Sequence, residues 1–76
     1  MTAALTDEIA VRFSANLRDR RKAAGLSQEA LGFRASIHPT WISHLESGTA
    51  YPSLATVARL AGALDIDPSE LLGKHC

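Results

Sequence analysis

The chain has 76 residues, which is enough for one small domain and too few for two separate hydrophobic cores. Eight basic and eight acidic residues give a formal net charge of zero, and 46% hydrophobic with 21% charged residues is an ordinary globular composition. The sequence has no apolar run of membrane-spanning length, no secretory signal pattern and only one cysteine. These features predict a single-domain cytoplasmic protein without disulfide bonds or a membrane anchor.

The apolar residues recur with a helical period along the whole chain, and no segment alternates with the period of two that a strand requires. The sequence therefore predicts an all-α fold. Start and stop signals place five helices at about 7–24, 28–34, 39–47, 54–63 and 68–72. The expected N-caps are Thr6, Ser27 and Ser53, and the expected stops are Gly25 and Gly48. Residues 67–70 (DPSE) have the spacing of a capping box.

Two of the expected helices carry clear apolar stripes that should face the core. They consist of Ile9, Phe13 and Leu17 in the first helix and Leu54, Val57, Ala61 and Leu64 in the fourth. In the short second helix Leu31 should be buried, whereas Phe33 projects the other way and should pack under the first helix or against another subunit.

The zero net charge conceals an uneven distribution of charged residues. Residues 12–34 contain six basic and two acidic residues, whereas the segments on either side are net negative. A neutral protein can still present one basic face, and such a face can bind a polyanion. The pattern alone leaves open whether the segment binds nucleic acid or is only a solvated helix face.

The expected third helix has two faces of different chemistry. At about 100° per residue, the inward face carries Ile42 and Leu45 together with Glu46, His38 and Pro39. The opposite face carries Thr40, Ser43, His44 and Ser47, with Trp41 on the border. A solvated face usually carries Glu, Lys or Arg, which are better helix formers. Short hydroxyls and an imidazole are instead suited to a close approach to base edges in the major groove of DNA.

Glu46 points toward the core in this arrangement, and a buried carboxylate without a partner is costly. Arg21 is the expected partner, because it follows Leu17 by four residues on the apolar face of the first helix. A two-pronged arginine–carboxylate pair would tie the first helix to the end of the third.

Several stretches of the sequence closely resemble the lambda-repressor-like (Cro type) helix-turn-helix domain. They are residues 26–31 (LSQEAL), 35–43 (ASIHPTWIS), 45–48 (LESG), 52–54 (PSL), 60–64 (LAGAL) and 68–72 (PSELL). The resemblance covers about residues 9–72. It implies a compact five-helix DNA-binding domain in which the second and third helices form the motif, at about 27–47, and the third helix enters the major groove.

The resemblance also implies roles for individual residues. Thr40, Ser43 and His44 fall on base-reading positions, and Gln28 falls where the family has a phosphate contact that braces the recognition helix. Arg21 and Glu46 fall on the family's buried ion pair. With neighbouring candidates included, the expected DNA-binding residues are Gln28, Arg34, His38, Pro39, Thr40, Trp41, Ser43, His44, Ser47 and Thr49. For Trp41, packing on the second helix is an equally good expectation.

Three positions depart from the family pattern. Ser36 stands where the turn usually has a glycine in the left-handed conformation, and Gly32 stands where a small alanine is usual. The loop after the third helix, residues 47–52 (SGTAYP), lacks the lysine or arginine with which relatives often grip phosphate. We therefore expect the motif to form but its electrostatic contribution to be weak.

These observations predict a sequence-specific DNA-binding transcriptional regulator. It resembles both the short single-domain controllers of restriction–modification systems and the antidote halves of toxin–antitoxin pairs, and the sequence does not choose between them. It is expected to be a repressor or autoregulatory controller that binds a palindromic operator as a homodimer, with Ile66, Leu71 and Leu72 at the dimer interface. The alternative is an antitoxin or adaptor that mainly binds a partner protein of unknown identity. The sequence shows no catalytic motif and implies no cofactor or metal, since His75 and Cys76 alone supply too few ligands.

Overall fold

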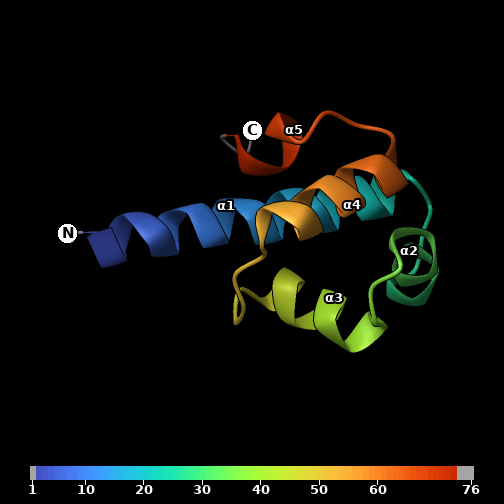
Figure 1. The fold of residues 1–76 in the computed structure, drawn as a ribbon, viewed down its shortest axis with the longest axis horizontal. Helices are drawn as coiled ribbons and strands as arrows, with labels where there is room; N and C mark the ends of the chain where they lie inside the picture. The colour runs from blue at the N-terminus through green and yellow to red at the C-terminus, as the bar shows by residue number, and fades with distance from the viewer. Residues whose placement is uncertain (1, 74–76) are drawn as a thin grey trace.

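The computed structural model describes residues 2–73, and its side chains from residue 8 onward (Figure 1). The helices are α1 (Thr2–Ala23), α2 (Gln28–Ala35), α3 (Pro39–Ser47), α4 (Leu54–Leu64) and α5 (Ser69–Leu72). The described residues contain no strand, so the predicted all-α class is confirmed. None of these helices combines the length and the apolar composition needed to cross a membrane. His75 and Cys76 lie outside the described residues.

The long helix α1 forms the spine of the molecule, as Figure 1 shows. It packs against α3 on one side and α5 on another, while α2 packs against both α3 and α4. The N-terminal end of α1 projects past the other helices, and α2 lies at the far end of the molecule. This arrangement leaves one side of α3 uncovered along its whole length.

Most of the predicted helix ends are found in the structure. The Ser27 hydroxyl accepts a hydrogen bond from Ala30 N at 3.0 Å, and Ser53 caps α4 through Thr56 N at 3.1 Å. Gly25 and Gly48 both have positive φ after their helices. At the last helix the two expected bonds form: Ser69 N donates to the Asp67 carboxylate and Asp67 N to Glu70.

The start of α1 differs from the prediction. The helix begins at Thr2, so Thr6 lies inside it and is not its N-cap. Residues 2–5 (TAAL) contain no glycine or proline and include three good helix formers, which lets the helix continue toward the N-terminus. The other differences are single residues: α1 ends one residue earlier than expected, α2 and α4 each end one residue later, and α5 begins one residue later.

One core unites all five helices. The fully buried side chains at its centre are Phe13, Leu17, Leu31, Ile42, Leu45, Leu60 and Leu71. The expected stripes were wrong at their N-terminal ends: Ile9 is 42% exposed and Leu54 83% exposed, and both line an open groove. On α4, Leu60 is buried instead of Leu54. Asn16 fastens α5 to α1, since its Nδ2 donates to the carbonyl oxygens of Leu71 at 3.0 Å and Gly73 at 2.9 Å.

Candidate nucleic-acid interface

Helix α3 has the two faces that its sequence predicts. Ile42, Leu45 and Glu46 are buried, and the opposite side is exposed over Thr40, Ser43, His44 and Ser47. His38 was expected to face inward and is instead exposed, because it precedes the helix as its N-cap: its Nδ1 accepts a hydrogen bond from Thr40 N at 3.1 Å. The exposed face contains no acidic or basic side chain apart from the imidazole, so hydroxyls and a ring nitrogen are what it can offer to a ligand.

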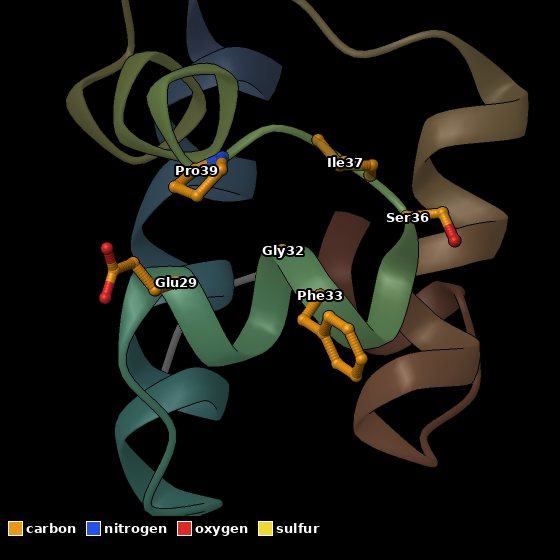
Figure 2. Close-up of a pocket in the computed structure, with 6 residues that line it drawn as sticks. All are labelled: Glu29, Gly32, Phe33, Ser36, Ile37 and Pro39. Atoms are coloured by element: carbon orange, nitrogen blue, oxygen red, sulfur yellow. The ribbon is translucent and has the colours of Figure 1, made fainter.

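The turn that sets α3 against α2 is tight, and two of the departures from the family pattern bear on it: Ser36 lies in the turn, and Gly32 lies on α2 against it. Ser36 adopts the left-handed conformation with φ 58° and ψ 44°, and its backbone N–H points to the carbonyl oxygens of Gly32 and Phe33. A Cβ at Gly32 would lie 2.4 Å from the Ile37 carbonyl oxygen, so no side chain fits there. Figure 2 shows Gly32 beneath the turn residues, with Phe33 pointing away. The unusual glycine therefore allows the backbone of the turn to lie directly on α2.

The predicted ion pair between α1 and α3 is present. Arg21 Nε lies 2.6 Å from Glu46 Oε2, and Arg21 Nη2 lies 3.0 Å from Oε1. Arg21 also donates to the Leu26 carbonyl oxygen at 2.9 Å, and Gln28 Nε2 donates to Glu46 Oε1 at 3.2 Å. The Glu46 side chain is 2% exposed and that of Arg21 12%. The hydrogen bonds that Arg21 donates to Glu46, together with the negative charge of Glu46, raise the pKa of Arg21 and outweigh the opposing effect of burial.

Glu46 therefore holds three helices in register. Its carboxylate accepts hydrogen bonds from Arg21 on α1 and from Gln28 at the start of α2, while its own backbone belongs to α3. Gln28 uses one amide hydrogen for Glu46, and the second remains for another acceptor. The bracing role that the resemblance implied for Gln28 is thus visible in the free protein.

Sequence reasoning missed one member of this cluster. Arg18 belongs to the basic segment that the sequence left open between nucleic-acid binding and a solvated helix face, and its Nε lies 3.9 Å from Glu46 Oε1. The side chain is about half exposed, so it adds positive charge at the surface beside the buried pair. The spacing contained the signal, because residues three apart on a helix lie on the same face and Arg18 precedes Arg21 by three.

The far end of α3 carries a second polar cluster that the sequence did not reveal. His44 Nδ1 lies 3.3 Å from Thr49 Oγ1, which lies 2.9 Å from Ser47 Oγ. Trp41 stands edge-on to the His44 ring, with the ring centroids 6.3 Å apart. This cluster depends on the loop folding back over the helix end after Gly48, a tertiary feature that helical periodicity does not describe.

The remaining DNA-binding candidates fall at the two ends of α2 and the start of α3. Gln28 and Pro39 are half-buried, and Arg34 is exposed near the end of α2. The prediction that Phe33 packs under α1 was wrong, since the residue is 89% exposed. Among the described residues, no cluster of three His, Cys, Asp or Glu side chains is placed to hold a metal ion.

The expected dimer residues require a correction. Leu71 is fully buried inside its own protomer because α5 folds back on α1, so it has no surface to offer a second chain. Ile66 and Leu72 are half-buried and pack against the same core. The exposed apolar surface lies nearby, at a groove of about 300 Å³ between α1 and the start of α4. Its lining residues are Ile9, Ala10, Phe13, Tyr51, Pro52, Leu54, Val57 and Leu72.

Comparison with known proteins places this geometry in context. Residues 12–72 match the family described as "Helix-turn-helix domain". The chain is 35% identical over 69 residues to the control protein C.BamHI of Bacillus amyloliquefaciens. The aligned region covers 90% of this chain and 85% of that protein.

Solved structures agree with this comparison. The restriction–modification controller protein C.AhdI from Aeromonas hydrophila superposes with a TM-score of 0.79 at 42% identity, over 82% of this chain and 94% of that one. The hypothetical transcription factor NHTF from Neisseria gives a TM-score of 0.84 at 26% identity, over 87% and 76% of the two chains.

Proposed function

This chain belongs to the helix-turn-helix domain family, and on that premise we propose that it is a cytoplasmic DNA-binding transcription regulator that reads its operator with α3. The observation that carries the proposal is the uncovered, uncharged face of α3, formed by Thr40, Ser43, His44 and Ser47. A helix of nine residues is about 13 Å long, which suits contact with a few successive base pairs in the major groove. Hydroxyls and an imidazole there can donate to or accept from base edges.

The contacts to the DNA backbone are proposed to come from the flanks of α3. Gln28 retains an amide hydrogen for a phosphate, and Arg34 extends from the end of α2. His38, Pro39 and Trp41 border the reading face and complete the proposed footprint. Because residues 48–53 contain no charged side chain, this regulator should depend on hydrogen-bonded contacts more than on counterion release.

The two relatives named as control or controller proteins support a more specific role. We propose that this chain is a restriction–modification controller that acts as a repressor or autoregulator of its own promoter. The shared length supports this, since the match spans 90% of this chain and 85% of C.BamHI. Binding alone is sufficient for repression, whereas activation would need a further contact with the transcription machinery.

We propose that the regulator binds as a homodimer through the apolar groove between α1 and α4. One short recognition helix makes few contacts, and two copies on half-sites about 34 Å apart combine them. Leu54, at 83% exposed, and the half-exposed Ile9 and Tyr51 provide apolar surface that a second copy would cover. Half-buried Leu72 lines the same groove, whereas Ile66, in the connection between α4 and α5, packs on the core and does not line the groove.

Fluorescence anisotropy tests the proposal. Labelled duplex DNA from upstream of the chain's own gene is titrated with the protein at several salt concentrations, beside a scrambled duplex of equal length. A specific regulator should bind the upstream duplex about a thousandfold or more tightly than the scrambled one. Equal affinity for the two would contradict the proposed function.

The same titration examines the alternative of an antitoxin or adaptor. The observation that favours a protein partner is Phe33, whose ring is 89% exposed on the outer side of α2. A Phe33→Ser variant that retained full specific DNA binding would show that this surface is not part of DNA recognition. If the wild type showed no specific DNA binding, the antitoxin or adaptor alternative would be favoured.

A further inference from the structure

His44, near the end of α3, belongs to a small hydrogen-bonded cluster with Ser47 and Thr49. Nδ1 lies 3.3 Å from Thr49 Oγ1. The two hydroxyl oxygens, of Thr49 and Ser47, are 2.9 Å apart. Each hydroxyl is also within hydrogen-bond distance of the His44 backbone carbonyl oxygen, at 3.2 Å for Thr49 and 2.9 Å for Ser47. The Trp41 ring lies edge-on to the imidazole, and Nδ1 is the ring nitrogen that contacts the loop.

The supply of hydrogens decides which nitrogen of the neutral ring is protonated. Each hydroxyl has only one hydrogen to donate. If Nδ1 carries no hydrogen, Thr49 must donate to it, and only the Ser47 hydrogen is left for the other contacts. If Nδ1 carries the hydrogen, it donates to Thr49, and both hydroxyl hydrogens remain for the carbonyl oxygen and the second hydroxyl. The Nδ1-protonated ring therefore makes one more hydrogen bond.

We propose that Thr49 is a positioning residue that fixes neutral His44 in the Nδ1-protonated form, so that Nε2 is an acceptor toward the DNA. The inference rests on the proposed function, because it specifies what α3 reads. A free histidine side chain favours the opposite form, with the hydrogen on Nε2, and would then be a donor. The loop thus reverses the hydrogen-bonding character of the residue that reads the base.

The consequence for recognition follows from the chemistry of the major groove. The donors there are the exocyclic amines, N6 of adenine and N4 of cytosine, whereas guanine and thymine present acceptors at the equivalent positions. An acceptor at Nε2 therefore selects adenine or cytosine on the contacted strand. A donor at Nε2 would favour guanine or thymine.

The assignment also changes the role of Thr49 itself. Sequence reasoning placed Thr49 among the DNA contacts. When its oxygen accepts from His44 and its only hydrogen goes to Ser47 or to the carbonyl oxygen, the hydroxyl has no hydrogen left for a phosphate. Thr49 then acts on the DNA only through His44.

Nitrogen NMR tests the proposal without DNA. Ring nitrogen shifts of ¹⁵N-labelled protein are recorded at about pH 8.5, where histidines with ordinary pKa values are neutral. The His44 signals are assigned by their loss in His44→Ala. The expected wild-type pattern is a proton-bearing Nδ1 and an unprotonated Nε2. A wild-type ring protonated mainly on Nε2 would overturn the proposal.

Three variants separate a positioning role from a merely structural one. Thr49→Val keeps the shape and removes the hydroxyl, so the ring should revert to the Nε2-protonated form. Thr49→Ser restores a hydroxyl and should restore the wild-type shifts. Ser47→Ala leaves the contact between His44 and Thr49 and should also keep them. Identical spectra for Thr49→Val and the wild type would show that Thr49 does not set the form of the ring.

Selection from a randomised duplex library then reports the base preference. The base pair that His44 reads is identified as the position of the selected sequences at which the base preference disappears in His44→Ala. At that position the wild type and Thr49→Ser should prefer adenine or cytosine by about three- to tenfold, the value of one hydrogen bond, and Thr49→Val should lose or reverse this preference. Wild-type selection of guanine or thymine would overturn the proposal. If the wild type selected no sequence at all, the proposed function would fail, while the NMR result would still stand on its own.

Discussion

Substitution of Glu46 by alanine examines the link between the three helices that position α3. The change removes both acceptors of Arg21 and the acceptor of Gln28, while Arg21 keeps only its bond to the Leu26 carbonyl oxygen. Breaking a buried pair by removing one partner destabilises a protein by about 3–5 kcal/mol. Because the Arg21 side chain is 12% exposed and can regain some hydration, we expect the low end, about 3 kcal/mol.

Urea unfolding followed by circular dichroism measures this loss, and the chain offers a matched control. Arg12 and Glu8 form an exposed pair on α1, with side chains 30% and 58% exposed and an N–O distance of 3.4 Å. Glu8→Ala should cost at most about 0.5 kcal/mol. For a domain of this size, a loss of 3 kcal/mol lowers Tm by roughly 12–24 °C. The reasoning is refuted if Glu46→Ala is no more destabilising than Glu8→Ala.

Four further outcomes are expected. Gly32→Ala should destabilise the fold, because its Cβ would lie 2.4 Å from a backbone oxygen. Gly62→Ala on α4 meets nothing within 4 Å and should stabilise the fold by up to about 1 kcal/mol. The urea unfolding midpoint should therefore fall for the first variant and rise for the second. Leu54→Asp should change the free energy of unfolding of the protomer by less than about 0.5 kcal/mol, because Leu54 is exposed. It should nevertheless lower the sedimentation coefficient from the value of a dimer to that of a monomer. An unchanged coefficient would exclude the groove as the dimer interface. The affinity for operator DNA should fall by less than about a thousandfold between 50 and 200 mM salt, and a steeper slope would reveal phosphate contacts beyond those proposed. A hydrogen bond from the Ser69 backbone holds the pKa of Asp67 below its ordinary value, so the stabilisation from its charge is full above that ordinary value and is lost as the pH falls through the lower, folded-state pKa. The difference in Tm between the wild type and Asp67→Ala should therefore shrink as the pH is lowered through the acid range, and a constant difference would rule out the charge as its source.

Local signals in the sequence were sufficient for most of the helix ends and for the buried ion pair of the site. Ser27, Ser53 and Gly48 act through hydrogen bonds or backbone angles within a few residues of themselves, so their roles can be read without the tertiary fold. The partner of Glu46 could also be inferred, because a buried carboxylate needs a cation and helical spacing places Arg21 on the same face as Leu17.

Features that depend on how helices approach one another could not be inferred. The burial of Leu71 depends on α5 folding back on α1, which no local pattern encodes. The close contact at Gly32 depends on the backbone of the turn, and the cluster around His44 depends on the path of the loop. The exposure of Leu54 has the same origin, since a stripe with the right period is buried only where another element covers it.

The division of α3 into a buried and an open face has a consequence for how such a protein can change during evolution. Its inner residues, Ile42, Leu45 and Glu46, anchor the helix to the core, and none of the four outer residues belongs to that core. Substitutions on the open face, which we propose reads the operator, should therefore alter the preferred DNA sequence with little loss of folding free energy. A lineage of such proteins could acquire new operators one residue at a time, while the scaffold that holds α3 remained unchanged.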